Sequence, residues 1–421
     1  MIFFSFFLAY LLCKIDVLCK IILFSLIICY VFLLVDSLYQ FVTGFNILGY
    51  KATDRISSFF GEKLIMGSFV SRTLPVALSI LFFVKIRLNE LCKVFIIFIS
   101  GILVYFSAER LAFAYYLFTV IFFILINLRK KKILFTLLLL LIFTFLTLFH
   151  FKSDSFDRLF VHTVKQSKET GHYGFSYRHE LHFITAFNLF NDSKLLGHGL
   201  KSFRHLCRLE NYAPTEKIKI DNTVFSNNEG QFFLLDDLSK KYNFLIIEKN
   251  FDKNKLPKII SEISSVEHNS FQKLNDRLYY HKVDEGLYYY RLANEFSGIF
   301  VKHNDFVRKG QPLGFSYEFL NGCNTHPHNI YFEFMSELGL IGLMFLLIGF
   351  FYILYNIFIT LKNIYLKKNI NSNSAFLFSS LGILISIFPL FPSGSFFNNW
   401  LSSIFYFNVA FFFYFQKKIN D

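Results

Sequence analysis

The sequence predicts a mostly α-helical, polytopic membrane bundle of about eight or nine transmembrane helices, with a large α+β loop domain outside the cytoplasm. Two observations predict this fold class: apolar runs of nearly membrane-spanning length recur, and one long polar segment interrupts them. Of the 421 residues, 54% are hydrophobic and only 17% are charged, whereas a soluble domain has about a quarter charged residues. The composition therefore excludes a disordered chain, a collagen-like fibre and an ordinary soluble enzyme.

The apolar runs approach the length of about 20 residues that a helix needs to cross the hydrocarbon core of a bilayer. They cover residues 21–37, 67–84, 94–108, 111–128, 133–149, 338–361, 374–391 and 400–416, and a shorter run opens the chain at 1–13. A cleaved signal peptide would give one such run before a cleavage site, not a series. We therefore expect N-terminal membrane helices within 1–149 and C-terminal membrane helices within 329–421.

The polar segment at 150–328 lacks any run long enough to span a membrane, and so long an insertion is usually functional or a domain of its own. Within it, 206–322 predicts an atypical α/β insertion. Residues 244–247 and 286–292 suit strands, and 256–280 follow a helical pattern. Residues 297–314 resemble half of a lipoyl/biotinyl-type barrel-sandwich hairpin, but they lack the lysine-bearing tip, so we expect no attached cofactor.

The basic residues are placed unevenly along the chain. Outside 150–328 the net charge is +10, out of +13 for the whole chain. Short loops rich in Lys and Arg stay in the cytoplasm, and fourteen of the nineteen Lys and Arg residues outside 150–328 fall in alternate loops. This alternation places 38–66, 107–110, 150–328 and 392–399 on the outer side. Topology explains the charge, so the basic balance does not indicate binding to nucleic acid.

Five basic residues depart from this alternation: Lys51, Arg55, Lys63, Arg72 and Arg110. Arg72 and Arg110 lie at or inside apolar segments, where a charged side chain is rare and usually functional. Two structural explanations remain open for Arg110, which are an ion pair with the adjacent Glu109 and extension of its side chain to the membrane interface.

All twelve histidines lie within 150–328, largely because membrane helices exclude polar residues. His179 and His182 are three residues apart and so do not form the zinc motif, which places two histidines at i and i+4. We predict no metal site. Cys207 and Cys323 both lie on the outer side and are able to form a disulfide there, although their spacing does not decide it.

The most specific stretch runs from Thr325 to Gly342, at the return of the chain into the membrane. Pro327 fixes the approach, Asn329 is suited to cap a helix, and Gly339 and Gly342 allow another backbone to come close. His328 is thereby expected at the outer membrane boundary, near the face where Arg110 emerges. A neutral histidine there can act as a general base.

This stretch resembles the signature of the O-antigen ligase superfamily, which is His-Asn/Ser/Gln, nine residues, Gly, two residues, then a small residue or Tyr. His328-Asn329, Gly339 and Gly342 match it in full. Three further stretches are similar to the family, in the expected order: residues 55–60 with 66–69, residues 107–111, and residues 177–181 with 195–203. The resemblance covers about 50–205 and 323–360.

The resemblance implies a GT-C-type membrane glycosyltransferase that is inverting, metal-independent and without cofactors. Its donor would be a glycan on a polyprenyl diphosphate, and its acceptor a hydroxyl of lipid A–core or of another glycan. Arg110 and Arg178 would hold the diphosphate, and His328 would take or orient the acceptor proton. The second-rank residues for substrate contact or positioning are Arg55, Arg72, His326 and Asn329. The protein would lie among the lipids of a bacterial inner membrane, with its large loop in the periplasm.

Two departures and several alternatives accompany this prediction. Family members often have around a dozen helices, and 206–322 has no counterpart in the family core. Within the family, an O-antigen polymerase or a protein O-oligosaccharyltransferase is an alternative to the ligase. Outside it, a transporter would show inverted repeats, and a receptor would leave Arg110, Arg178 and His328 apart. The transferase hypothesis expects these three side chains to line one outward-facing cavity.

Overall fold

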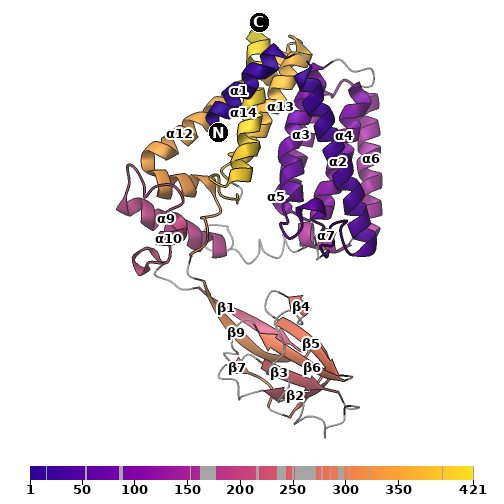
Figure 1. Ribbon diagram of the computed structural model, residues 1–421, viewed down its shortest axis with the longest axis vertical. Coiled ribbons are helices and arrows are strands. Elements are labelled where there is room, and N and C mark those ends of the chain that lie inside the picture. Colours follow the sequence, from indigo (N-terminus) through magenta and orange to yellow (C-terminus); the bar gives the residue numbers. More distant parts are fainter. Residues whose placement is uncertain are drawn as a thin grey trace. The chain divides into compact units, whose positions relative to one another are not determined.

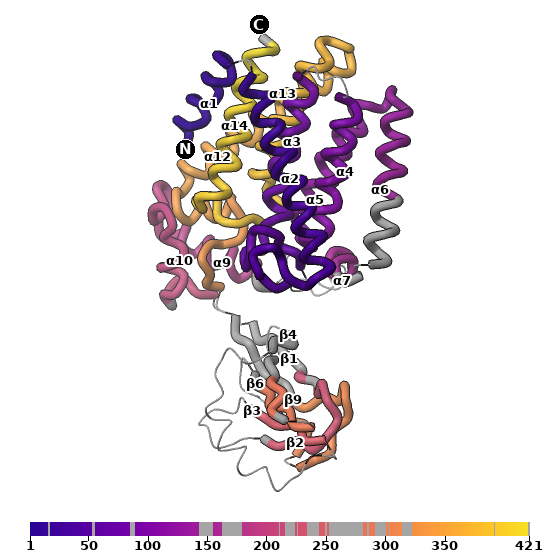
Figure 2. The backbone as a smooth tube through the Cα atoms, turned by 45° about the vertical axis from the view of Figure 1, so that its right-hand side comes forward, coloured from indigo at the N-terminus to yellow at the C-terminus, as the bar shows by residue number. Residues whose placement is uncertain are grey.

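A computed structural model describes the chain in two units. It describes residues 1–15, 17–52, 55–84, 89–151, 153–161, 177–214, 218–234, 243–248, 251, 272–275, 278–284, 286–292, 298–302, 304–320, 322–390 and 392–420. The first unit comprises Met1–Ala213 and Gly322–Asp421, and the second comprises Pro214–Asn321. Figures 1 and 2 show the helices of the first unit and the strands of the second. Each unit is described by itself.

The first unit is a helical bundle, and each of the eight predicted apolar runs coincides with one of its helices. Its long helices are α1 Ile2–Lys14, α2 Leu18–Thr43, α3 Met66–Phe83, α4 Asn89–Ser107, α5 Arg110–Ile126, α6 Lys131–Phe151, α12 Ile330–Tyr365, α13 Ile370–Ser386 and α14 Asn399–Asn420. In the described residues, α2, α3, α4 and α12 are long and apolar enough to cross a membrane, and α1, α5 and α13 are shorter apolar helices. The prediction of a polytopic, multi-pass membrane protein is confirmed.

The centre of the bundle is α3, whose residues are buried except at the two partly exposed positions Phe69 and Phe83. It packs against α13, where Phe82 stacks on Phe378 with the ring centroids 5.4 Å apart. The side chain of Asn408 in α14 donates to the carbonyl of Arg72 at 3.3 Å. In contrast, α2 and α12 leave many large apolar side chains exposed, as is expected of helices that face lipid.

Short helical elements and loops lie at the end of the bundle opposite the C-terminus, which Figure 1 marks. They are the 3₁₀ turn Ser58–Phe60, α7 Ser153–Phe156, the π-helical turn Asp157–Val161, α9 Tyr177–Asp192, α10 Phe203–Leu206 and the 3₁₀ turn Glu210–Tyr212. The last turn of α14 carries Lys417 and Lys418, so these basic residues lie away from α9 and α10. This separation agrees with the alternation of charge in the loops.

The second unit is built from two antiparallel sheets. The strands are β1 Ile218–Phe225, β2 Gly230–Leu234, β3 Asn243–Ile247, β4 Gln272–Asn275, β5 Leu278–Asp284, β6 Leu287–Leu292, β7 Gly298–Ile299, β8 Phe306–Val307 and β9 Pro312–Leu320. One sheet has the order β1-β9-β7 and the other has the order β4-β5-β6-β3-β2-β8. The hairpin predicted at 297–314 thus contributes strands to both sheets. A small core around Phe232, Phe244 and Tyr290 forms the interior.

The secondary structure predicted for the insertion is right at two strands and wrong at one helix. Residues 244–247 form most of β3, and 287–292 form β6. The helix predicted over 256–280 is wrong where it is described, because 272–275 and 278–280 belong to β4 and β5. Tyr279 and Tyr280 pair with Arg291 and Tyr290 across the sheet, and such aromatic cross-strand pairing favours strands. Residues 256–271 lie outside the described residues.

Candidate functional site

The first turn of α12 is fixed by Asn329. Its side-chain oxygen accepts hydrogen bonds from the backbone N–H groups of Tyr331 at 2.9 Å and Phe332 at 3.4 Å. Its amide nitrogen donates to the carbonyl of Pro389 at 2.8 Å. The expected helix cap is therefore confirmed. The predicted contact of Asn329 with substrate is not needed to explain this buried side chain, whose described hydrogen bonds all go to the protein.

A break in α12 at Gly339 joins the helix to the turn after α9. Gly339 has φ 65° and ψ −159°, a conformation that is essentially restricted to glycine. Beyond the break, the backbone N–H of Leu340 donates to the carbonyl of Lys194 at 2.7 Å, and the N–H of Gly199 donates to the carbonyl of Glu337 at 2.8 Å. The two sequence motifs, 195–199 and 328–342, therefore fold onto each other through their backbones.

The two glycines of the signature have different surroundings. A Cβ on Gly339 would lie 2.4 Å from the carbonyl oxygen of Leu195, so the expected close approach of another backbone is confirmed there. A Cβ on Gly342 would instead meet the side chain of Leu338 at 2.2 Å. The absence of a side chain at Gly342 thus leaves space for Leu338 in the same helix. Of the two glycines, only Gly339 has to be glycine because another segment of the chain lies against it.

Two carboxylates on the first part of α12 hold the neighbouring loops in place. Glu337 accepts backbone hydrogen bonds from Lys201 at 2.5 Å and Phe203 at 3.4 Å, at the start of α10. Glu333 accepts from the hydroxyl of Ser395 at 2.5 Å and from the backbone of Phe396 at 2.8 Å. Both are buried at 1% exposure. Neither residue was predicted from the sequence, although two carboxylates four residues apart next to an apolar run are a recognisable signal.

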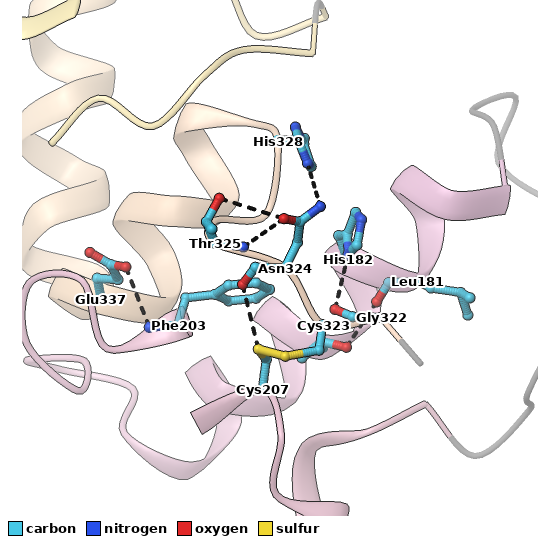
Figure 3. Close-up of a disulfide and its surroundings, with 11 residues drawn as sticks. Leu181, His182, Phe203, Cys207, Gly322, Cys323, Asn324, Thr325, His328 and Glu337 are labelled. Atoms are coloured by element: carbon cyan, nitrogen blue, oxygen red, sulfur yellow. Dashed lines mark hydrogen bonds between the residues drawn. A yellow bond between two sulfur atoms is a disulfide. The ribbon is translucent and has the colours of Figure 1, made fainter. Parts of the chain in front are cut away.

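Four histidines gather at the start of α12. The ring centroid of His328 lies 4.2 Å from that of His326, 5.2 Å from that of His182 and 5.6 Å from that of His179. His182 is held by a contact of 3.0 Å between its Nδ1 and the carbonyl of Gly322. Figure 3 shows His182 and His328 beside the segment from Gly322 to Thr325. The two histidines of the 178–182 stretch therefore belong to the same cluster as the signature histidine.

His328 has a left-handed backbone conformation, and its side chain is fixed by a hydrogen bond. Its φ is 58°, and its carbonyl accepts a hydrogen bond of 2.7 Å from the N–H of Ser393. Its Nε2 lies 3.0 Å from the amide nitrogen of Asn324. Because that amide nitrogen only donates, Nε2 is the acceptor, and the neutral ring carries its proton on Nδ1. Left-handed backbone at a non-glycine residue is found at functional sites when the surroundings hold it.

Loss of hydration keeps His326 and His328 uncharged. Loss of hydration lowers the pKa of His328 from its usual value to about 3, and the neighbouring His326, His182 and His179 lower it further. Burial also lowers the pKa of His326 to about 4, although its contact with the carbonyl of Ser393 opposes the shift. Both rings are therefore neutral at physiological pH. Among the residues that the structure describes, no group of His, Cys, Asp and Glu has an arrangement suited to a metal ion.

Arg110 and Arg178 lie at the starts of two different helices. Arg110 opens α5, and its Nε donates to the carbonyl of Arg158 at 3.0 Å. Arg178 lies in the first turn of α9, and its side chain lies outside the described residues. The described contacts of Arg110 do not include His328, so the convergence of these three side chains remains a prediction.

Arg55 and Arg72 surround Glu109. Arg55 donates to the carbonyls of Ser107 at 2.8 Å and Leu64 at 2.7 Å, and its guanidinium lies 3.5 Å from the Glu109 carboxylate. The explanation that Glu109 pairs with Arg110 is therefore replaced by a pair with Arg55. Arg72 is buried, with its guanidinium 4.8 Å from the centroid of the Tyr115 ring. These contacts indicate that Arg55 holds the segment before α3 against the end of α4, and that Arg72 packs between α3 and α5.

Arg72 also reaches toward the segment that holds the histidines. It lines a small cavity of about 20 Å³ with Ser393 and Gly394. Ser393 contacts His328 and His326, because its N–H donates to the carbonyl of His328 and its carbonyl lies 3.3 Å from Nε2 of His326. Arg72 is thus separated from the histidine cluster by one loop residue, and it does not contact it directly in the described interactions.

A disulfide between Cys207 and Cys323 decides the question that the sequence left open. The two Cα atoms are 5.0 Å apart, and the Cys207 sulfur lies 3.6 Å from the carbonyl of Asn324. Figure 3 shows the bond between the end of α10 and the segment that leads to His328. Cys207 is buried at 2% exposure. The disulfide therefore fixes the residue next to Asn324, whose side chain contacts His328.

Comparison with known proteins gives one match. Residues 95–231 match the family model described as O-antigen ligase. The match confirms the predicted resemblance over 95–205, whereas the prediction that 206–322 has no counterpart in the family is wrong over 206–231. The matched region contains Arg110, Arg178 and the turn at 195–199, and the segment around His328 lies beyond it. Neither the comparison with curated proteins nor that with solved structures found a match.

Proposed function

We propose that this chain, a multi-pass membrane protein with a region matching the O-antigen ligase family, is a glycosyltransferase that ligates a glycan onto lipid A–core. The donor is a glycan on a polyprenyl diphosphate, and the reaction takes place at the periplasmic face of a bacterial inner membrane. The family match supports ligase- or polymerase-like glycosyl transfer. The observation that carries the site is that the matched region contacts the α12 segment at two places. The ring of His328 lies 5.2 Å from that of His182 in α9, and the break at Gly339 lies against the turn after α9.

The proposed reaction is a single displacement that inverts the anomeric centre. The oxygen of the acceptor hydroxyl forms a bond with the anomeric carbon of the donor glycan. The bond between that carbon and the diphosphate oxygen breaks, and its electron pair leaves with the polyprenyl diphosphate. The hydroxyl proton goes to His328. Proton removal during bond formation makes the acceptor oxygen a better nucleophile.

His328 is suited to this step by its neutral ring and its unprotonated Nε2. In the structure, Asn324 donates to that nitrogen at 3.0 Å. An acceptor hydroxyl that takes the place of the Asn324 amide would meet a nitrogen able to accept its proton. With a pKa of about 3, the His328 ring is a weak base when no substrate is bound. A bound anionic diphosphate would raise that pKa, because an opposite charge favours the protonated ring.

The proposed role of Arg110 and Arg178 is to bind the diphosphate and to stabilise the negative charge that develops on it. A guanidinium presents a planar pair of donors to phosphate oxygens and stays charged. Both residues lie in the matched region. His326, 4.2 Å from His328, would position the catalytic ring. Arg55 and Arg72, whose described contacts are with the protein, would support the site from the adjacent loops.

Complementation of a bacterial strain that lacks its own ligase tests this proposal. Surface polysaccharide is read on a gel, after membrane levels of each variant have been equalised by immunoblot. We expect capped lipopolysaccharide with the unchanged protein and its loss with His328→Ala and with Arg110→Ala. The control is His205→Ala, because His205 is exposed and outside the histidine cluster. If both His328→Ala and Arg110→Ala still produced capped lipopolysaccharide, the proposed mechanism would be contradicted.

The intermediate that accumulates distinguishes a ligase from an O-antigen polymerase. Loss of ligation leaves a complete polymer on the polyprenyl diphosphate, whereas loss of polymerisation leaves single repeat units. We expect polymer in the His328→Ala strain. Single repeat units would assign the chain to the polymerase alternative, and a glycosylated protein that disappears in the mutant would assign it to protein O-glycosylation.

A further inference from the structure

A polar cavity lies beside the histidine cluster, on the side of the turn after α9. Its volume is about 320 Å³, which is at the lower end of the range of small-molecule sites. The lining residues come from three segments far apart in the sequence: the turn and α10, the approach to α12, and the loop before α14. They are Lys201, Arg204, Thr325, His326, Ser395, Asn398 and Asn399. No described lining residue is apolar, so the cavity is not suited to a lipid chain.

Neither cationic side chain of this cavity forms an ion pair with a carboxylate among the described residues. The Nε of Arg204 is buried and has no hydrogen-bond partner, and such a buried unsatisfied donor calls for an explanation. The carboxylates of Glu333 and Glu337 interact electrostatically with Arg204, and that of Glu337 also with Lys201. Their oxygens already accept hydrogen bonds from the loops around the cavity. Arg204 and Lys201 are thus available to an anion that enters the cavity.

The cavity wall is held in place before any ligand arrives. Lys201 has φ 62°, and its backbone N–H is bound by Glu337. The opposite wall is set by Ser395, which is hydrogen-bonded to Glu333. Both carboxylates belong to the first part of α12, so one rigid helical segment sets the spacing of the two walls. Strained backbone that is firmly held is a feature of preorganised binding sites.

The chemistry of the lining selects the ligand. Two cations bind a phosphate or carboxylate, and the amides of Asn398 and Asn399 with the hydroxyl of Thr325 suit the hydroxyls of a sugar. We propose that this cavity binds an acidic sugar, bearing a phosphate or a carboxylate, in the glycan acceptor. His326 lines the cavity and lies 4.2 Å from His328, so a sugar bound there is placed next to the residue that acts on the acceptor hydroxyl. This inference rests on the proposed function.

Thermal shift of the purified full-length protein in detergent tests binding without any need for activity. The probes are glucose 6-phosphate, glucuronate, neutral glucose and geranyl diphosphate. We expect the two acidic sugars to raise the unfolding temperature and glucose not to do so. Arg204→Gln and Lys201→Gln should each weaken binding of the acidic sugars by about 10- to 100-fold, the usual effect of losing a charge-assisted hydrogen bond. Arg208→Gln is the matched control, because Arg208 is an exposed arginine four residues further along the chain and does not line the cavity.

The outcomes separate the two possible sources of the anion. If geranyl diphosphate binds in an Arg204-dependent manner and the acidic sugars do not, the cavity belongs to the donor and the proposal is overturned. Equal shifts for Arg204→Gln and the unchanged protein would also overturn it. Arg204→Lys, which keeps the charge, guards against a folding defect and should retain part of the binding.

Transfer assays keep this proposal distinct from the proposed function. With a phosphorylated acceptor, Arg204→Gln should raise KM by about 10- to 100-fold and leave kcat within about threefold. With the same acceptor after phosphatase treatment, Arg204→Gln and the unchanged protein should have equal KM values. An unchanged KM for the phosphorylated acceptor would reject the acidic-sugar site while leaving glycosyl transfer intact. Failure of the function itself would appear as retained capping in the His328→Ala and Arg110→Ala strains.

Discussion

Gly339 in α12 and Gly197 in the turn after α9 approach each other more closely than any side chain permits. A Cβ on Gly339 would lie 2.6 Å from the backbone nitrogen of Gly197, and a Cβ on Gly197 would lie 2.4 Å from the carbonyl carbon of Glu337. Both residues also have positive φ, 65° and 66°. The contact joins the end of the signature that contains His328 to the region that matches the O-antigen ligase family.

Gly339→Ala should therefore destabilise this junction. We expect a loss of about 1–3 kcal/mol from backbone strain alone, together with reduced capping in the complementation strain. The measurement is the unfolding temperature in detergent beside the capping assay. Gly349→Ala is the control, since Gly349 lies in the same helix and a Cβ there meets nothing within 4 Å. Equal behaviour of the two variants would contradict the role given to the contact.

The two half-buried histidines, His326 and His328, should make the protein sensitive to acid. Their folded-state pKa values, about 3 for His328 and about 4 for His326, lie below the value of about 6.5 expected in the unfolded chain. Below pH 6.5 the unfolded chain therefore binds protons that the folded protein does not. Stability is fully present above about pH 6.5 and is lost as the pH falls toward 4 and then 3.

The unfolding temperature at pH 7.5 and at pH 4.5 measures this effect. The double variant His326→Gln/His328→Gln should lose less stability over this range than the unchanged protein, because it lacks the two groups that resist protonation. The variant His205→Gln, altered at an exposed histidine, should follow the unchanged protein. A double variant that is as acid-sensitive as the unchanged protein would show that other groups control the response.

Removal of the Cys207–Cys323 disulfide should lower stability and disturb the position of His328. Loss of a native disulfide in a small domain typically destabilises by about 2–5 kcal/mol, and this one closes a segment with a sequence separation of 116. We expect Cys207→Ser/Cys323→Ser to unfold at a lower temperature and to cap lipopolysaccharide less. Cys29→Ser is the control, because Cys29 is a free cysteine in α2. A reductant should lower the unfolding temperature of the unchanged protein to that of the double variant. It should not affect the double variant.

Arg55 should matter for stability more than for substrate affinity. Its contacts with Ser107, Leu64 and Glu109 are with the protein, so Arg55→Ala leaves a partly buried carboxylate without this partner. We expect a loss of about 1–3 kcal/mol and a KM for the donor within about threefold of normal. Lys63→Ala, at an exposed residue of the same loop, should have no effect on the unfolding temperature. A large rise in donor KM with unchanged stability would instead make Arg55 a substrate ligand.

The membrane helices could be predicted well because the bilayer imposes a length and an apolar composition that the sequence displays directly. The cap at Asn329 and the close contact at Gly339 could be predicted because each follows from the chemistry of one residue. The insertion was harder, since the Tyr-rich segment of β5 forms a strand only through its pairing with β6. Pairing partners far apart in sequence are not visible in a local pattern.

The histidine cluster and the carboxylates of α12 show the same limit for the site. His179 and His182 could not be assigned to His328 from sequence, because 140 residues separate His182 from the carbonyl of Gly322 that holds it. Glu333 and Glu337 were visible as charges at an apolar run, but their partners, Ser395 and the backbone of Lys201, are set by tertiary folding. The pairing of Glu109 with Arg55 in place of Arg110 has the same cause.

The disulfide also has a consequence for how this protein can change over evolutionary time. It joins Cys207 and Cys323, just outside the β-rich unit of Pro214–Asn321, so the ends of that unit are already pinned together. The entropy of closing a loop grows only slowly with its length. A change in the length of the 214–321 segment is therefore expected to alter the entropy of closing that loop only slightly, while the disulfide continues to hold the backbone that leads to His328.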